Sequence, residues 1–280
     1  CFAAMYLARA HMIKHEWAEA AKYAQVIIDN VPILTSASDI LQGFSSLNLP
    51  DIVYGCDITA DNSTIYMSWF SQMDMFGDGY AAIGVWRAGF EPTVERMGAT
   101  DIRRDWFVTP DNYARLSAEL GLYPEVYYQV GPAGGGLPWY QSCKFIGAGR
   151  SNVVDGYGSG WELGDYIYLR SEEAHFIKAE ALAHMGDANA VKALNDFMVT
   201  RDPNYAYTFS DKAALIEEIN YQKRVEFWGE GIEYLDNRRL NIPIDRTDAT
   251  WGAANNHMDG GKMKLTQDDC NFLYQIPKSV

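Results

Sequence analysis

The sequence predicts a mainly α-helical protein built from tetratricopeptide-like helical hairpins, with long irregular loop insertions and a few short strands. Apolar residues recur at helical spacing in three stretches, at about 2–30, 166–201 and 211–239. Alanines stand where paired helices must approach closely, which is typical of helical repeats. Residues 31–165 differ, because they are rich in Gly, Asp, Asn, Tyr and Trp and show little periodicity.

Residues 2–30 are predicted to form the first helical hairpin. The second helix of this hairpin carries Ala20, Ala24 and Ile27 at helical spacing, which gives one apolar stripe. Pro32 ends that helix, because proline lacks an N–H group and disfavours helix in the residue before it.

A second hairpin is predicted at about 166–201. Ala174, Ile177 and Ala181 form the apolar stripe of its first helix, and Gly186 marks the turn. The segment AEALAHMGDANA resembles ARAHMIKHEWAEA of the first hairpin, so the two hairpins are expected to be copies of one repeat.

The remaining segments complete the predicted organisation. Three short apolar runs in the loop region are expected to be strands, at 51–58, 123–130 and 143–146. Loops as long as the rest of this region are usually functional. We expect one domain over residues 1–280, divided into a repeat hairpin (1–30), a variable loop-rich ligand region (31–165), helical repeats (166–240), and a C-terminal insert with a closing segment (241–280).

The charge balance narrows the class of ligand. The 280 residues include 23 Lys and Arg against 37 Asp and Glu, which gives a net charge of −14. Nucleic acids and anionic membranes require a basic surface, so neither is an expected partner. Neutral sugars are compatible with an acidic protein. No run of about 18 apolar residues is present, so no membrane-spanning helix is predicted.

The four cysteines do not predict a metal centre. Cys1, Cys56, Cys143 and Cys270 are far apart and lack the Cys and His spacing of zinc sites. A mature bacterial lipoprotein begins with a lipidated cysteine, but a polar tether normally follows it. Here a predicted helix follows Cys1 at once, so we expect Cys1 to be the accidental first residue of a piece of a longer chain.

Several motifs resemble those of one protein family. The stretch LARAHMIKHEWAEAAKYAQVII is similar to an early family repeat, and DYIYLRSEEAHFIKAEALAHMGD to its Arg-x-x-Glu and Ala-Glu-Ala pattern. DIRRDWF and the closing FLYQIPKSV are also similar to family elements. The segment Glu217 to Pro243 is similar to the family's closing motif through Arg224-Val-Glu226, Glu230-Gly231, Asp236 and Arg238-Arg239. Together they resemble the SusD/RagB family of bacterial surface glycan-binding proteins.

This resemblance implies a function. Members are outer-membrane lipoproteins exposed at the cell surface, which capture oligosaccharide and deliver it to a SusC-like TonB-dependent transporter. The resemblance implies no catalysis, no cofactor and no metal. It also implies membrane attachment only through a lipid anchor, which we do not expect within this stretch of sequence.

Charged residues on the repeat helices are expected to be structural. Buried Arg–carboxylate forks fix the register of packed helices, and catalytic residues are found more often on loops. We therefore interpret eight residues as interhelical ion pairs rather than as an acid–base site: Arg170, Glu173, Glu180, Arg224, Glu226, Glu230, Arg238 and Arg239.

Aromatic residues in the loops are the predicted glycan contacts. Flat rings stack on the C–H faces of sugars, while neighbouring polar groups bind the hydroxyls. Most Trp and Tyr residues of a globular protein are partly buried, so core packing is the competing interpretation. The candidates lie in Gly- or Asn-rich surroundings and are Trp69, Tyr80, Trp86, Trp139, Tyr140 and Trp251.

Two other functions are consistent with the sequence. A pure protein-interaction scaffold would use the concave face of helical repeats, but it would not need so long an aromatic-rich insertion. A glycan-cleaving enzyme would need two carboxylates across a sugar cleft. Asp74, Asp78 and Asp101 are the candidates for that role, although no motif favours them.

Overall fold

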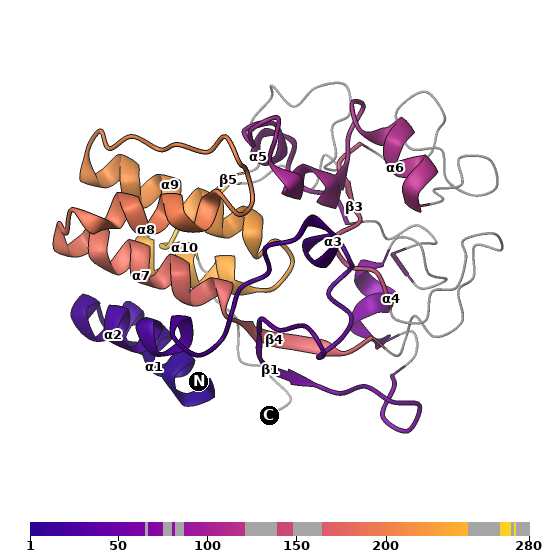
Figure 1. The fold of residues 1–280 in the computed structure, drawn as a ribbon, viewed down its shortest axis with the longest axis horizontal. Helices are drawn as coiled ribbons and strands as arrows, with labels where there is room; N and C mark the ends of the chain where they lie inside the picture. The colour runs from indigo at the N-terminus through magenta and orange to yellow at the C-terminus, as the bar shows by residue number, and fades with distance from the viewer. Residues whose placement is uncertain are drawn as a thin grey trace.

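The structure is a computed structural model that describes residues 1–64, 67–74, 80–81, 87–120, 139–147, 164–245, 264–269 and 272. It confirms a mainly α-helical fold with a few short strands (Figure 1). The helices are α1 (Phe2–Ile13), α2 (Trp17–Ile28), α3 (Ala37–Ile40), α4 (Trp69–Met73), α5 (Glu91–Glu95), the 3-10 helix η2 (Ile102–Trp106), α6 (Tyr113–Leu120), α7 (Glu172–Met185), α8 (Asn189–Met198), α9 (Lys212–Glu226) and α10 (Ile232–Leu240). The strands are β1 (Ile52–Cys56), β2 (Phe107–Val108), β3 (Gln141–Ser142), β4 (Tyr166–Arg170), β5 (Ile244–Asp245) and β6 (Lys264–Leu265).

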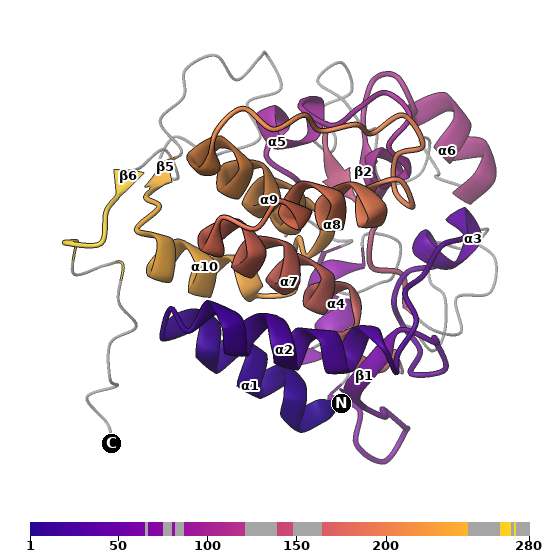
Figure 2. The ribbon, with the colours of Figure 1, turned by 60° about the vertical axis from the view of Figure 1, so that its left-hand side comes forward.

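The helical repeats stack around α7. The α1–α2 hairpin packs along one side of α7, and α8 and α9 pack along other sides (Figures 1 and 2). Ala20 and Ala24 of α2 and Ala174 and Ala181 of α7 are completely buried. Side chains this small let the helix backbones approach closely, which the sequence pattern predicts.

The β1–β4 ribbon joins the repeats to the loop region. The two strands are antiparallel, with Ile52 opposite Arg170 and Cys56 opposite Tyr166. The expectation that the second hairpin begins at about residue 166 is therefore wrong, since 166–170 is a strand and the helix begins at Glu172. The alternating Tyr-Ile-Tyr run favours a half-buried strand over a helix.

The other predicted strands have mixed outcomes. The run 51–58 contains β1, whereas 123–130 lies outside the described residues. The run 143–146 is not a strand, and β3 ends just before it. Lys144 within that run turns its side chain inward, where it donates to the carbonyl oxygen of Glu226 at 2.7 Å. The backbone of this run bonds at single points instead, with the N–H of Cys143 donating to the carbonyl oxygen of Trp106 at 2.8 Å.

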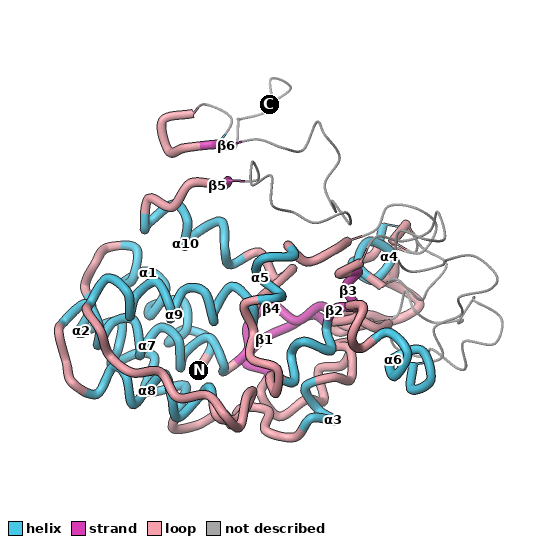
Figure 3. The backbone as a smooth tube through the Cα atoms, turned by 90° about the horizontal axis from the view of Figure 1, so that it is seen from above, coloured by secondary structure: helices cyan, strands magenta, loops and turns pink. Residues whose placement is uncertain are grey.

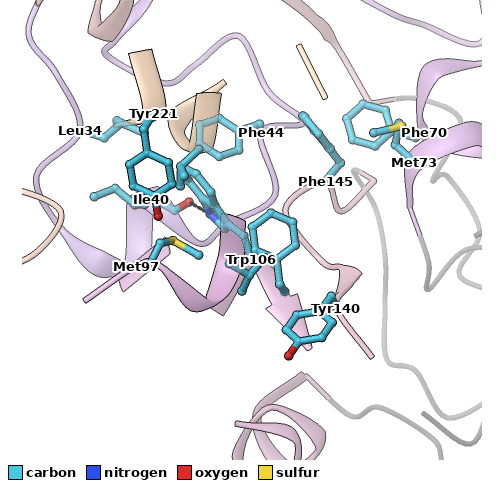
Figure 4. Packing of buried hydrophobic residues seen from close by; sticks show 13 residues of the cluster. Leu34, Ile40, Phe44, Phe70, Met73, Met97, Trp106, Tyr140, Phe145 and Tyr221 are labelled. Carbon is cyan, nitrogen blue, oxygen red and sulfur yellow. Dashed lines mark hydrogen bonds between the residues drawn. The ribbon is translucent and has the colours of Figure 1, made fainter. Parts of the chain in front are cut away.

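In Figure 3, α1, α2, α7 and α8 of the repeats lie at one end of the molecule, and α4 and α6 of the loop region lie at the other. The loop region packs around an apolar core that it shares with Tyr221 and Val225 of α9. Trp106 is 1 % exposed, and its indole N–H donates to the carbonyl oxygen of Ile40 at 3.0 Å. Its ring packs edge-on against Phe44 at 5.8 Å between centroids (Figure 4). This core fixes the irregular backbone on which the candidate site is built.

Two further observations concern the described residues. Their helices are too short and too polar to span a lipid bilayer. Within this part of the chain Cys1, Cys56 and Cys143 form no disulfide, and Cys270 lies outside it.

Candidate functional site

A buried charge network occupies the junction between the repeats and the loop region. Glu226, at the end of α9, is inaccessible to solvent and faces three guanidinium groups. Arg201 contacts both of its carboxylate oxygens at 3.1 Å, Arg170 lies at 3.4 Å and Arg103 at 3.5 Å. Burial alone would raise the pKa of Glu226, but the charges of these arginines outweigh it and hold the pKa well below its usual range. Glu226 is therefore a permanent anion.

Arg170 extends this network to the surface. Its Nε and Nη2 donate to the two carboxylate oxygens of Glu230 at 3.0 and 2.9 Å, in a bidentate fork. Lys144 donates to the same carboxylate at 2.6 Å. Burial opposes the ionisation of Glu230, yet the neighbouring charges of Arg170 and Lys144 lower its pKa. Glu230 is consequently a poor proton donor at neutral pH.

Two more buried pairs hold the helices of the repeats together. Glu173 on α7 accepts from the Nε of Arg9 on α1 at 2.7 Å. Glu180 lies two helical turns further along α7 and accepts from the Nη2 of Arg239 on α10 at 2.6 Å. Each pair joins helices that are far apart in the sequence, which suits a role in fixing their packing.

The last two arginines of the predicted set lie nearer the surface. Arg224 lies 2.9 Å from Glu233, and both side chains are partly exposed. Arg238 donates to the side-chain amide oxygen of Gln267 at 2.9 Å. Pairs of this kind contribute little to stability because water competes for them.

Sequence analysis did not name several members of the network. These are Arg9, Arg103, Lys144, Glu172 and Arg201. Arg9, Arg103 and Glu172 belong to the quoted family motifs, which was the available signal. Lys144 and Arg201 lie on segments whose proximity to α9 is evident only in the folded chain.

A pocket of about 470 Å³ opens beside this network. Its walls come from α4, from β4, from the turn between α9 and α10, and from the apolar core. The pocket is lined by Phe44, Met67, Ser68, Trp69, Gln72, Phe145, Asp165, Tyr166, Ile167, Tyr168, Arg170, Gly229, Glu230 and Gly231. It thus combines aromatic rings with a few polar groups, as small-molecule sites commonly do.

Trp69 is held firmly in the wall of this pocket. It is the first residue of α4, whose N-cap Ser68 accepts from the backbone N–H of Ser71 at 3.1 Å. The backbone N–H of Trp69 donates to the hydroxyl of Tyr166 at 3.1 Å, and the indole packs edge-on against Phe145 at 5.5 Å. The ring is half-buried, so one part is fixed by packing and another is open to a ligand.

The turn between α9 and α10 supplies the opposite wall. Gly229 and Gly231 have φ angles of +82° and +79°, a conformation that residues with side chains rarely adopt. A Cβ atom at Gly229 would also lie only 2.8 Å from the ring of Phe145. Glycine at this position therefore keeps the pocket open next to Phe145.

Three other predicted aromatic contacts, all among the described residues, do not line this pocket. Tyr140 is a core residue at 5 % exposure, and its hydroxyl donates to Glu95 at 3.0 Å. Trp139 packs edge-on against Tyr113 at 5.8 Å. Tyr80 is exposed and does not line the pocket, while Trp86 and Trp251 lie outside the described residues.

The pocket contains aromatic residues that sequence analysis did not name. Tyr166 and Tyr168 come from β4, and Phe145 comes from the segment after β3. The alternation in Tyr-Ile-Tyr was the available signal, because it places both tyrosines on one face of a strand.

Two of the three carboxylates considered for glycan cleavage form hydrogen bonds or ion pairs within the fold. Asp101 is buried and bonded to Arg103, with Arg103 Nη2 at 2.7 Å from its Oδ2. Asp74 is also buried and accepts from the backbone N–H of Gly147 at 2.7 Å. Asp78 lies outside the described residues.

Comparisons with known proteins identify solved structures with a similar fold. No family model and no curated protein matches the chain. Among solved structures, a SusD-like carbohydrate-binding protein of Bacteroides vulgatus matches 99 % of the chain at 20 % identity and a TM-score of 0.71. A putative sugar-binding protein of the same organism matches 99 % at 18 % identity and a TM-score of 0.66.

The chain has a SusD-like fold. A third match, the surface glycan-binding protein A of Bacteroides thetaiotaomicron, covers 85 % of the chain at 18 % identity and a TM-score of 0.54. The chain spans 56 %, 56 % and 53 % of the length of these three structures. The SusD-like fold predicted from the sequence motifs is thereby confirmed.

Proposed function

We propose that the chain is part of a cell-surface glycan-binding protein, and that the pocket beside Trp69 binds an oligosaccharide. The observation that carries this proposal is the composition of the pocket. Trp69, Tyr166 and Tyr168 offer rings and hydroxyls, whereas the charged groups of its lining are engaged by other groups of the fold. Sugars are neutral ligands with apolar faces and many hydroxyls, and such a lining suits them.

The proposed role is capture without cleavage. Arg170 and Lys144 hold Glu230 ionised, so this carboxyl at the pocket is poorly suited to act as a general acid. The structural neighbours include a carbohydrate-binding protein and a surface glycan-binding protein, which supports the same class of function. By the same analogy, the whole protein would be anchored in the outer membrane and deliver its glycan to a TonB-dependent transporter.

Binding to a panel of neutral oligosaccharides, measured on a glycan array and then by calorimetry, tests this proposal. The Trp69→Ala variant is expected to bind the best oligosaccharide at least about tenfold more weakly, since it loses a stacking surface. Trp139→Ala is the matched control, because Trp139 packs against Tyr113 outside the pocket. It should retain wild-type affinity.

Three results would count against the proposal. Unchanged glycan affinity of the Trp69→Ala variant would show that the pocket is not the glycan-binding site. Absence of binding to every glycan of the panel would favour a protein-interaction scaffold. Release of shortened products during incubation would show an enzyme.

A further inference from the structure

Lys144 is a buried lysine that holds the turn between α9 and α10 from behind the pocket. It lies in the segment after β3 and is 1 % exposed. Its ammonium group donates to the carbonyl oxygens of Glu226 and Trp228 at 2.7 and 3.0 Å. It also donates to a carboxylate oxygen of Glu230 at 2.6 Å. One side chain from the loop region therefore fixes the end of α9 and the following turn at three points.

The three acceptors are groups that need a donor. The last carbonyl groups of a helix have no partner within the helix, and α9 ends at Glu226. The same end of a helix carries a partial negative charge, which favours a cation. A buried carbonyl or carboxylate that loses its donor is costly. The ammonium group of Lys144 thus matches both the charge and the hydrogen-bonding needs of the turn.

The position of Lys144 is fixed by aromatic rings as well as by its acceptors. Its Nζ lies 4.6 Å from the ring centroid of Trp106, 5.1 Å from that of Phe145 and 5.5 Å from that of Phe44. A cation over an aromatic face is attracted to it. The three rings belong to the apolar core of the loop region (Figure 4). Lys144 therefore connects this core to the turn.

The connection reaches three walls of the pocket, although Lys144 does not line it. Phe145, the next residue along the chain, lines the pocket. Glu230 in the turn also lines it, and so does Arg170 of β4, which grips the same carboxylate as Lys144. The turn, β4 and the segment after β3 consequently meet at the ammonium group and the carboxylate of one ion pair.

We propose that Lys144 is a positioning residue for glycan binding, whose ammonium group holds the turn between α9 and α10 in the place that shapes the pocket. This inference rests on the proposed glycan-binding function and adds to it a residue outside the pocket on which affinity depends. The three hydrogen bonds to the turn carry the proposal, because no shift of the turn can preserve all of them.

The charge of Lys144 can be removed without a mutation. Burial lowers the pKa of Lys144 to about 8, and the charge of Arg170 acts in the same direction, whereas the charges of Glu230 and Glu226 oppose it. A neutral amine has one N–H group fewer than an ammonium group, so the three acceptors can no longer all be served. Glycan affinity should therefore fall as pH rises through about 8.

The contribution of Lys144 to stability should change in the opposite direction. In the unfolded chain a lysine keeps its proton up to a pH of about 10. Between about pH 8 and pH 10 the unfolded state therefore binds the additional proton, and this contribution to the free energy of unfolding rises with pH. A fall in affinity over this range is thus distinguished from loss of the fold.

The test measures affinity by calorimetry at pH 7, pH 8 and pH 9. The probes are maltohexaose, laminarihexaose, cellohexaose, xylohexaose and mannohexaose, which carry no group that titrates in this range. Lys144→Met keeps a long side chain for the core but has no donor, and it should bind about tenfold more weakly at pH 7. Its affinity should not change with pH, whereas that of the wild-type chain should decline towards the same value at pH 9.

Two variants serve as controls. Lys223→Met removes another buried lysine, which pairs with Asp236 at 2.8 Å and does not line the pocket, so it should keep the wild-type affinity. Asp51→Asn removes a group whose pKa burial raises to about 8 and which faces Arg170 at 3.7 Å. This variant should keep the decline in affinity between pH 7 and pH 9. Melting curves establish that each variant is folded.

The outcomes separate this inference from the proposed function. Wild-type affinity in Lys144→Met, or a decline with pH that this variant retains, overturns the role of Lys144 while the pocket stands. A decline that disappears in Asp51→Asn also contradicts it. If Lys144→Met does not fold, the pH profiles of the wild-type chain and Asp51→Asn decide. If none of the five probes binds the wild-type chain, both proposals fail.

Discussion

The buried charge network and the pocket share Arg170 and Glu230 but use their polar groups in opposite ways. In the network, carboxylates and guanidinium groups satisfy one another out of contact with water. In the pocket, half-buried and exposed aromatic residues leave rings and hydroxyls open. We infer that the charged residues nearest to the pocket support it, and that Trp69 and the tyrosines of β4 are the proposed glycan contacts.

Glu226→Ala is expected to have the largest effect. The substitution leaves three buried guanidinium groups without the carboxylate that they share. This loss should lower the free energy of unfolding by about 4–5 kcal/mol. Glu217→Ala is the control on the same helix, because Glu217 is mostly exposed and its loss should cost at most about 0.5 kcal/mol. Urea unfolding of the two variants measures the difference. Similar midpoints would show that the network does not hold the fold.

The adjacent residues Arg238 and Arg239 provide a second, smaller contrast. Arg239→Ala removes the partner of Glu180, which is fully buried, and should destabilise by about 3 kcal/mol. Arg238→Ala loses an exposed bond to Gln267 and a contact with the ring of Phe272 at 5.7 Å, and should cost at most about 1 kcal/mol. Thermal unfolding compares the two variants, and equal losses would contradict the assignment of Arg239 to the buried set.

Gly229→Ala tests the pocket wall. The left-handed backbone and the approach to Phe145 should together cost about 2 kcal/mol, and glycan affinity should also fall. Gly186→Ala is the control, because Gly186 has a φ of +72° but no atom within 4 Å of an added Cβ. It should cost about 1 kcal/mol from backbone strain alone. If both variants lose the same stability and Gly229→Ala keeps its glycan affinity, Gly229 does not shape the pocket.

The smallest expected effect concerns Asp51, at the edge of the network. Within the described chain its carboxylate oxygens have no hydrogen-bond donor, and burial with the charge of Glu172 raises its pKa to about 8. The folded state therefore keeps a proton that the unfolded state releases near pH 4, so Asp51 lowers stability as pH rises from about 4 to about 8. Asp51→Asn should reduce this decline. Because the substitution also removes the charge that faces Arg170 at 3.7 Å, the net gain in stability at pH 8 should be only on the order of 1 kcal/mol. Unfolding free energies at pH 5 and pH 8 measure it, and parallel pH profiles would contradict the raised pKa.

The sequence predicted the helical repeats well and the pocket only in part. Ala20 and Ala174 belong to periodic stripes, so local pattern alone locates their helices. Trp69 stood out by its aromatic and polar neighbours. Tyr166 did not, because its role depends on the docking of α4, 97 residues earlier in the chain. Tyr140 shows the reverse case, in which an aromatic residue after a Gly-rich loop turns into the core.

The long reach of the network has a consequence for the folding kinetics. Arg103 and Glu226 are 123 residues apart, and Arg170 and Glu226 are 56 apart, so their contacts close large loops. Such contacts form slowly, and a partly assembled core would expose an unpaired buried charge. The network should therefore make folding cooperative across both ends of the molecule, and the pocket should take shape only in the final step.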